Sequence, residues 1–142
     1  MYSFRKSKKG FTLIELMVVV VIIGVLALLG LRLYLTQIAK SNNALIKANA
    51  GTVQTTIQAD LADLDPVSVY ALWTTGATVT ASGIHNPLTK LVQAAWPVTY
   101  GGAVAGQVWV EHDVSNAKFL INGKDAAGTA RVYLTTDLVA KY

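Results

Sequence analysis

Near the start of this chain, the residue best suited to chemistry is a carboxylate, Glu15, placed inside an apolar sequence. It lies between residues 11–14, in which only Thr12 is polar, and residues 16–31, which have no polar side chain. A carboxylate in hydrocarbon is costly unless a cation or hydrogen-bond donors meet it. Glu15 can cap its own helix, because Thr12 and Glu15 have the capping-box spacing. Alternatively, it can pair with a cation on a second chain.

Other residues that could bind a metal or catalyse a reaction are few. His85 and His112 do not have the spacing of a metal-binding pair, and we expect His112 at the surface. Three aspartates near predicted turns could meet in a calcium site, although acids at turns are usually solvated: Asp113, Asp125 and Asp137. The chain has no cysteine, and it contains no nucleophile elbow, phosphate loop or HExxH motif. The sequence therefore predicts no enzyme, no metal site and no cofactor.

The positive charge of the chain is concentrated at its start. Among 142 residues there are 12 Lys and Arg against 8 Asp and Glu, a formal net charge of +4. Four of these cations precede Gly10: Arg5, Lys6, Lys8 and Lys9. The cations beyond Gly10 balance the acids one for one. The basic character therefore indicates a targeting segment rather than a surface that binds nucleic acid.

The apolar run is long enough, with its flanks, to cross a membrane, which takes ~20 residues. Basic residues before it predict a cytoplasmic N-terminus, with the body of the chain outside the membrane. Three interpretations compete. A secretory signal peptide needs a small-x-small cleavage site, and none is convincing here. A plain membrane anchor leaves Glu15 unexplained, and the third interpretation is a leader that is cleaved after Gly10.

The segment KGFTLIELMVVVVIIGVLA resembles the N-terminus of the type IV pilin superfamily, whose precursors carry a class III signal peptide. Members have a short basic leader ending in glycine, cleavage before phenylalanine, and glutamate as the fifth residue of the mature chain. Gly10, Phe11 and Glu15 match these three features. The remainder of the chain resembles the family in layout only.

The resemblance implies a role for each matched residue. Gly10 would precede the bond cut by a prepilin peptidase, and Phe11 would become the N-terminus and be N-methylated. Glu15 would pair with the amine of Phe11 in a neighbouring subunit. The implied partners are further copies of the chain in a helical filament, the peptidase, the pilus assembly machinery and the cytoplasmic membrane before assembly. Nucleic acid would be a partner only of a filament that takes part in DNA uptake.

The chain departs from the family pattern in two respects. Many pilins have a proline partway along the mature helix, where the filament form unwinds, whereas this chain has Gly24 and Gly30 in that region. Glycine weakens a helix by ~1 kcal/mol and proline by ~3 kcal/mol, so no melted stretch is signalled. The disulfide that usually closes the C-terminal loop of pilins cannot form without cysteine.

Four segments are expected. Residues 1–10 would be a leader, 11–35 a transmembrane and filament-core helix, 36–65 an amphipathic helix, and 66–142 a globular head. An apolar stripe with helical spacing predicts the face of the amphipathic helix that packs in the core: Ile46, Ala50, Val53, Ile57, Leu61 and Leu64. Pro66 should end this helix.

The head is expected to contain short elements. Residues 67–73 suit either a strand or a helical turn, and Asn86 before Pro87 predicts the start of a short helix over 87–95. Strands are expected at 107–113, 118–121 and 131–135, with a turn at 114–117 and a second turn signal at Asn122–Gly123. The tryptophans, Trp73, Trp96 and Trp109, are expected in the core.

The sequence thus predicts an α+β fold, with a long N-terminal helix packed on a small antiparallel sheet of three or four strands. The resemblance implies a pilin that polymerises into a type IV pilus and supports adhesion, motility or DNA uptake. Its precursor would lie in the bacterial inner membrane and its mature form in an extracellular filament. The alternatives are a type II secretion pseudopilin, a minor pilin, a monomeric membrane-anchored binding module and, most remotely, a secreted enzyme.

Overall fold

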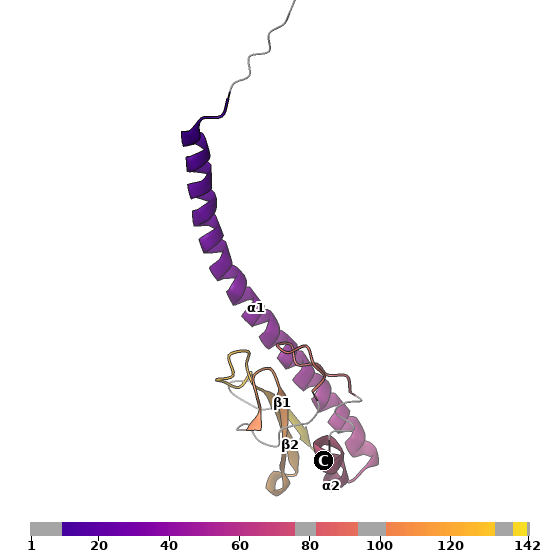
Figure 1. Ribbon diagram of the computed structural model, residues 1–142. Helices are drawn as coiled ribbons and strands as arrows, with labels where there is room; N and C mark the ends of the chain where they lie inside the picture. Colours follow the sequence, from indigo (N-terminus) through magenta and orange to yellow (C-terminus); the bar gives the residue numbers. More distant parts are fainter. Residues whose placement is uncertain (1–9, 76–81, 94–101, 133–137, 142) are drawn as a thin grey trace, which may run out of the picture. The chain divides into compact units, whose positions relative to one another are not determined.

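The chain forms two compact units joined by one continuous helix. The computed structural model describes residues 10–75, 82–93, 102–132 and 138–141. The first unit ends at Gln37 and the second begins at Ile38. Helix α1, Leu13–Asp63, belongs to both (Figure 1). It is helical through Gly24 and Gly30, so these glycines do not interrupt it in the single chain.

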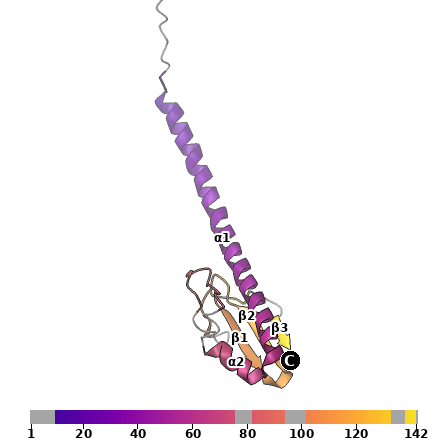
Figure 2. The ribbon, with the colours of Figure 1, turned by 90° about the vertical axis from the view of Figure 1, so that its right-hand side faces the viewer.

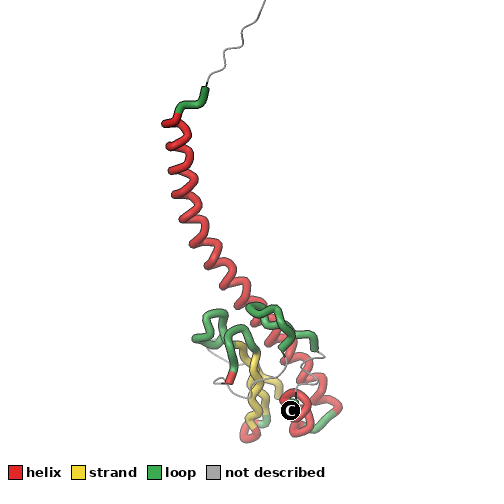
Figure 3. The backbone as a smooth tube through the Cα atoms, viewed as in Figure 1, coloured by secondary structure: helices red, strands yellow, loops and turns green. Residues whose placement is uncertain are grey.

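The second unit combines the C-terminal part of α1 with a second helix and a sheet. Helix α2 spans Pro66–Thr74, and the strands are β1, Val108–Asp113, β2, Lys118–Gly123, and β3, Leu138–Lys141. The strands pair antiparallel in the order β1-β2-β3, and a 3-10 turn, η2, Val114–Asn116, connects the first two. The sheet lies beside the C-terminal part of α1 (Figures 2 and 3). The predicted α+β fold, the three-stranded sheet and the turn at 114–117 are therefore confirmed.

The core of the second unit forms where α1 meets one face of the sheet. Ile46, Ala50, Val53 and Ile57 are fully buried, and Leu61 packs against them in part. The side chains that join them in one apolar cluster come mainly from α2 and the strands: Val69, Trp73, Val108, Val110, Phe119, Ile121 and Ala140. The predicted stripe is therefore confirmed up to Leu61. Leu64 is 42% exposed because α1 ends at Asp63, before the stripe would complete its next turn.

Proline and aspartate set the junction between the two helices. Asp65 adopts an extended backbone (φ −70°, ψ 153°), as a residue before proline prefers, and α1 ends just ahead of it. Pro66 then occupies the first turn of α2, where its missing N–H costs no hydrogen bond. The Asp65 carboxylate accepts hydrogen bonds from the backbone N–H of Ser68 at 3.0 Å and from its hydroxyl at 2.6 Å. Residues 67–73 are accordingly helical.

The predicted turn at Asn122–Gly123 is wrong, because both residues belong to β2. Asn122 is fully buried and opposite Trp109, while Gly123 is opposite Val108. A Cβ atom on Gly123 would collide with the Cγ2 methyl of Ile46 on α1. The glycine therefore permits close packing of the strand on the helix rather than a tight turn.

The predicted third strand over 131–135 is also wrong in position. Arg131 makes only an isolated bridge with Lys124, and β3 begins at Leu138 and pairs with the other end of β2. Residues 133–135 lie outside the described residues. The carboxylate of Asp125 accepts hydrogen bonds from the N–H groups of Thr129 at 2.7 Å and Ala130 at 2.9 Å, so the chain closes a loop here before it returns to the sheet.

The helix predicted over 87–95 is replaced by a turn in the described part of that segment. The side-chain oxygen of Asn86 accepts from the N–H of Leu88 at 2.8 Å, as a helix cap would. Lys90 then takes a left-handed conformation (φ 62°), and His85 pairs with Val92 as an antiparallel bridge. A left-handed residue stops helix propagation after one turn. Residues 94 and 95 lie outside the described residues.

His112, expected at the surface, is only half-buried, but its ring is on the core face of the sheet. His112 points away from Trp109, as expected, but that direction leads towards α2 because the even-numbered residues of β1 face the core. Its ring stacks on Phe119 at 4.6 Å and lies 5.2 Å from the ring of Tyr70. Trp109 is buried on the opposite face of the sheet, under the guanidinium of Arg131 at 5.0 Å from its ring. Trp73 is buried as predicted, and Trp96 lies outside the described residues.

Two glycine substitutions test this packing in opposite directions. Gly123→Ala should lower the free energy of unfolding by about 1–3 kcal/mol, because the new methyl group overlaps Ile46. Gly51→Ala should raise it by about 0.5–1 kcal/mol, because Gly51 lies inside α1 and a Cβ there meets open space. Denaturant unfolding of the full chain in detergent measures both. Equal changes in the free energy of unfolding for the two substitutions would contradict the close approach of Gly123 to Ile46.

Asp65 should make the stability of the second unit depend on pH. Hydrogen bonds from the Ser68 hydroxyl and N–H hold the pKa of Asp65 below its ordinary value. The stabilisation is therefore complete above the ordinary pKa, about 3.9, and is lost as the pH falls through the lower pKa of the folded chain. When the pH is lowered from about 5 to 3, the melting temperature should fall more for the wild type than for Asp65→Asn, which keeps the cap without titrating. Thermal unfolding at each pH measures this. An equal fall in the melting temperatures of the two proteins over this pH range would contradict this account.

Candidate assembly site

The segment before α1 is open to solvent at the predicted cleavage position. Phe11 is 78% exposed, and Gly10 is also exposed, with space around it that a side chain could occupy. Both residues precede the first helical turn, so the bond between them is not part of a helix. A protease that binds its substrate in extended form can therefore reach this bond without first unfolding α1.

Glu15 and Thr12 form a reciprocal capping box at the start of α1. The carboxylate oxygen Oε2 of Glu15 accepts hydrogen bonds from the backbone N–H of Thr12 at 2.9 Å and from its hydroxyl at 2.7 Å. In return, the N–H of Glu15 donates to the Thr12 hydroxyl oxygen at 3.3 Å. The capping use of Glu15 predicted from the spacing is thus present in the single chain. The other carboxylate oxygen, Oε1, takes no part in the box.

The first unit exposes an apolar helix surface along its whole described length. Val19 is the least exposed large apolar side chain between Phe11 and Leu35, and it is still 45% exposed. One face has a shallow groove of about 250 Å³, lined by Leu13, Leu16, Met17, Val20 and Val21. Apolar side chains at these spacings form the ridges and holes that receive side chains of another helix. This surface needs lipid or other helices around it.

Helix α1 is the one helix among the described residues that is long and apolar enough to cross a membrane. The qualifying stretch lies near the N-terminus, and none of it is buried inside the protein. Core helices of water-soluble proteins with similar composition are mostly buried, so exposure separates α1 from that class. A signal sequence would meet the same test of length and composition.

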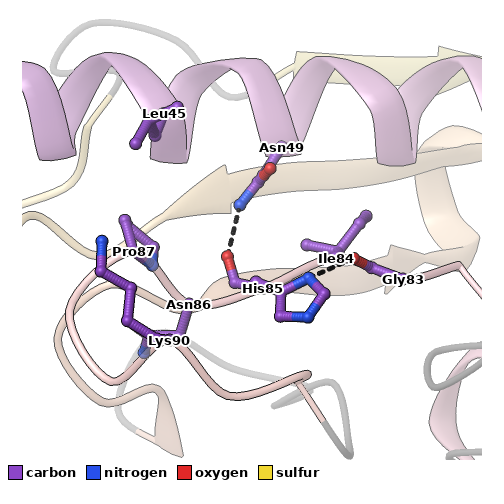
Figure 4. A pocket seen from close by; sticks show the side chains of 8 residues that line it. All are labelled: Leu45, Asn49, Gly83, Ile84, His85, Asn86, Pro87 and Lys90. Atoms are coloured by element: carbon purple, nitrogen blue, oxygen red, sulfur yellow. Dashed lines mark hydrogen bonds between the residues drawn. The ribbon is translucent and has the colours of Figure 1, made fainter.

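A cleft beside α1 in the second unit is lined in part by polar groups that serve the fold. It encloses about 360 Å³ between α1 and the loop that carries Gly83 to Lys90 (Figure 4). The Asn49 side chain donates to the His85 carbonyl at 3.0 Å, and Nδ1 of His85 lies 2.6 Å from the Gly83 carbonyl. These contacts hold the loop against the helix. His85 is therefore engaged with backbone rather than placed beside an acid or a nucleophile.

The aspartates considered for calcium act as local caps. Asp113 accepts from the N–H of Asn116 at 3.2 Å and from its side-chain amide at 2.8 Å, which closes η2. Asp125 orders the loop that follows β2, and Asp137 lies outside the described residues. Within the described ranges, no three His, Cys, Asp or Glu side chains come close enough to hold a metal ion.

Sequence reasoning missed three amides on α1 that connect the helix to distant segments. Asn43 accepts from the N–H of Ala126 at 2.8 Å, Asn49 binds His85, and Gln54 donates to the Val139 carbonyl at 2.8 Å. Their signal is their place beside the apolar stripe, at the border of the buried face. Side chains of this kind satisfy backbone groups that the packing would otherwise leave without partners.

Comparison with known proteins supports the resemblance of the N-terminal segment to type IV pilins and extends this similarity over most of the chain. Residues 5–31 match the family model of the prokaryotic N-terminal methylation motif. A type IV major fimbrial protein of Dichelobacter nodosus is 35% identical over 126 residues, covering 88% of this chain and 77% of the relative. The major component of the type IV narrow pilus of Thermus thermophilus is 35% identical over 107 residues, covering 75% and 73%.

Further relatives match over a shorter part of the chain. The type IV major alpha-pilin of Moraxella bovis is 42% identical over 55 residues, which is 39% of this chain and 35% of the relative. No solved structure gives a significant match. The relatives are therefore named as fimbrial or pilus subunits both where the match is local and where it covers most of the chain.

Proposed function

This chain belongs to the type IV pilin superfamily, and from that membership we infer that it is a structural subunit of a type IV pilus. The observation that carries this inference is the similarity to a type IV major fimbrial protein over 88% of the chain. The exposed apolar helix of the first unit provides the physical means, because mutual burial of such helices drives association. A structural subunit needs no catalytic site, cofactor or metal.

We propose that the precursor is processed between Gly10 and Phe11. The N-terminal methylation motif covers this position, and both residues are exposed ahead of α1. A prepilin peptidase would remove residues 1–10, and Phe11 would then carry a methylated amine. Residues 11–35 would form the membrane anchor and later the filament core, 36–65 the amphipathic helix, and 66–142 the head.

The orientation of the precursor follows from its charge. The basic residues before Gly10 would keep the N-terminus in the cytoplasm and place the second unit outside the inner membrane. Processing and assembly would then move the mature chain into an extracellular filament. The assembly machinery would supply the work of extraction, because leaving the bilayer costs apolar burial until neighbouring helices replace the lipid.

Glu15 would set the register between neighbouring subunits. Cleavage places a positive amine on Phe11, in the same apolar layer as Glu15. The carboxylate can pair with the amine of a neighbour through Oε1 while Oε2 keeps its hydrogen bonds to Thr12. A buried ion pair adds little net adhesion but excludes registers that leave either charge unpaired. The capping and assembly uses of Glu15 are therefore compatible.

Mass spectrometry of sheared surface filaments tests the processing step. The mature chain should begin at Phe11 and be one methyl group heavier than the unmodified sequence. Gly10→Val should leave the full-length precursor in the membrane, because the peptidase would meet a branched side chain where the family motif has glycine. A chain that begins at Met1 and occurs only in membranes would instead indicate a monomeric anchored module.

Two substitutions separate the uses of Glu15. Glu15→Gln keeps an oxygen for the capping box but removes the charge, and it should lower the filament yield by about tenfold or more. Thr12→Ala removes the hydroxyl of the capping box but keeps the backbone N–H and the charge of Glu15, and its filament yield should stay within about threefold of the wild type. Electron microscopy and immunoblots of sheared filaments measure both. The reverse order of effects would show that Glu15 serves its own helix only.

A further inference from the structure

The second unit has two ends that its own contacts identify. At one end, Asn43 binds the loop at Ala126, and Asn49 binds His85. At the other end, α1 passes into α2, and Tyr70 of α2 contacts His112 near the end of β1. The α1 axis therefore runs from the first group of loops to the junction with α2, as Figures 1 and 2 show for this unit.

The end at which α1 enters the unit is basic. Lys47 and Arg131 line the same cavity, of about 280 Å³, and Lys90 lines the cleft beside α1. Lys40 precedes Lys47 on α1. Lys124 is the backbone partner of Arg131 in an isolated β-bridge. Among the described residues of this end, one acid, Asp125, accompanies these cations. We define the basic end by its cations: Lys40, Lys47, Lys90, Lys124 and Arg131.

The opposite end is acidic. Its acids come from the end of α1, the cap of α2 and the second half of β1: Asp60, Asp63, Asp65, Glu111 and Asp113. Lys118 lies 3.8 Å from Asp113, and Lys141 is opposite Lys118 in the sheet, so the acids outnumber the cations. Hydrogen bonds hold the pKa of Asp65 and of Asp113 below the ordinary value, which keeps both charged in mild acid.

Separation keeps the two ends electrostatically distinct. Lys47 and Asp63 are both on α1, and the helical rise places them about 24 Å apart along its axis. The screening length at physiological ionic strength is only about 8 Å. Residues 38–142 contain seven cations and seven acids. The unit therefore has no formal net charge but presents opposite charge at opposite ends.

We propose that the basic end of one copy of this chain docks on the acidic end of the next copy along the filament. This inference rests on the proposed function, because a membrane inserts every copy in the same orientation and a filament of parallel copies brings unlike surfaces together. Opposite charges at such a contact favour the correct stacking and oppose reversed or slipped stacking. An anionic lipid surface could attract the basic end but offers no role for the acidic end.

Charge reversal at each end tests the contact. Lys40→Glu with Lys90→Glu reverses exposed charge at the basic end, and Asp63→Lys with Glu111→Lys does so at the acidic end. Each pair should lower the yield of sheared filaments by about tenfold or more, and all four together should restore it to within about threefold of the wild type. Thr55→Glu is the matched control, because it adds an exposed negative charge midway along this part of α1 and should change little.

Precursor levels in the membrane, measured in parallel, separate assembly from folding. If a reversal pair does not accumulate, the salt dependence of wild-type filaments replaces it, and raised salt should weaken them. If only the charge reversal at the basic end lowers the filament yield, the basic end binds lipid rather than another copy, and the proposal is overturned. Failure of the fourfold variant to recover, or salt-independent filaments, would also overturn it. If the wild type makes no filaments at all, the proposed function itself fails.

Discussion

An apolar helix surface without an intramolecular partner is the constraint on which this molecule depends. From Phe11 to Leu35 the large apolar side chains are exposed, although burying such side chains is the main source of stability in proteins. The chain therefore needs an environment that covers this surface. In the proposed function, lipid and then other copies of the chain would supply that cover, and Glu15 in the same surface would set the register.

The second unit buries its own apolar core, although the apolar surface of the first unit has no partner within the chain. Its part of α1 buries Ile46, Ala50, Val53 and Ile57 against the sheet, and amides beside this stripe bind backbone groups of distant loops. Gly123 allows β2 to approach Ile46 closely. One helix can thus serve assembly through its first part and folding through its second.

The sequence predicts the elements that rest on strong local signals. The apolar periodicity predicted the buried stripe of α1, Pro66 predicted the end of α1, and the expected strands at 107–113 and 118–121 located β1 and β2. The errors came where long-range packing overrode a local signal. Asn122–Gly123 has the composition of a turn but lies in β2, and Asn86 caps one turn that a left-handed Lys90 then ends. At the candidate site, the spacing of Thr12 and Glu15 predicted the capping box, whereas the proposed pairing between chains needs a cleaved N-terminus and a second copy, which a single precursor chain does not show.

The most direct test of the central claim is a structure of the intact filament by electron cryomicroscopy. The account predicts that the amine of Phe11 in one subunit lies within about 4 Å of the Glu15 carboxylate of a neighbour, in a core made of residues 11–35. A filament in which Glu15 contacts only its own Thr12, with the amine of Phe11 distant from every carboxylate, would contradict it.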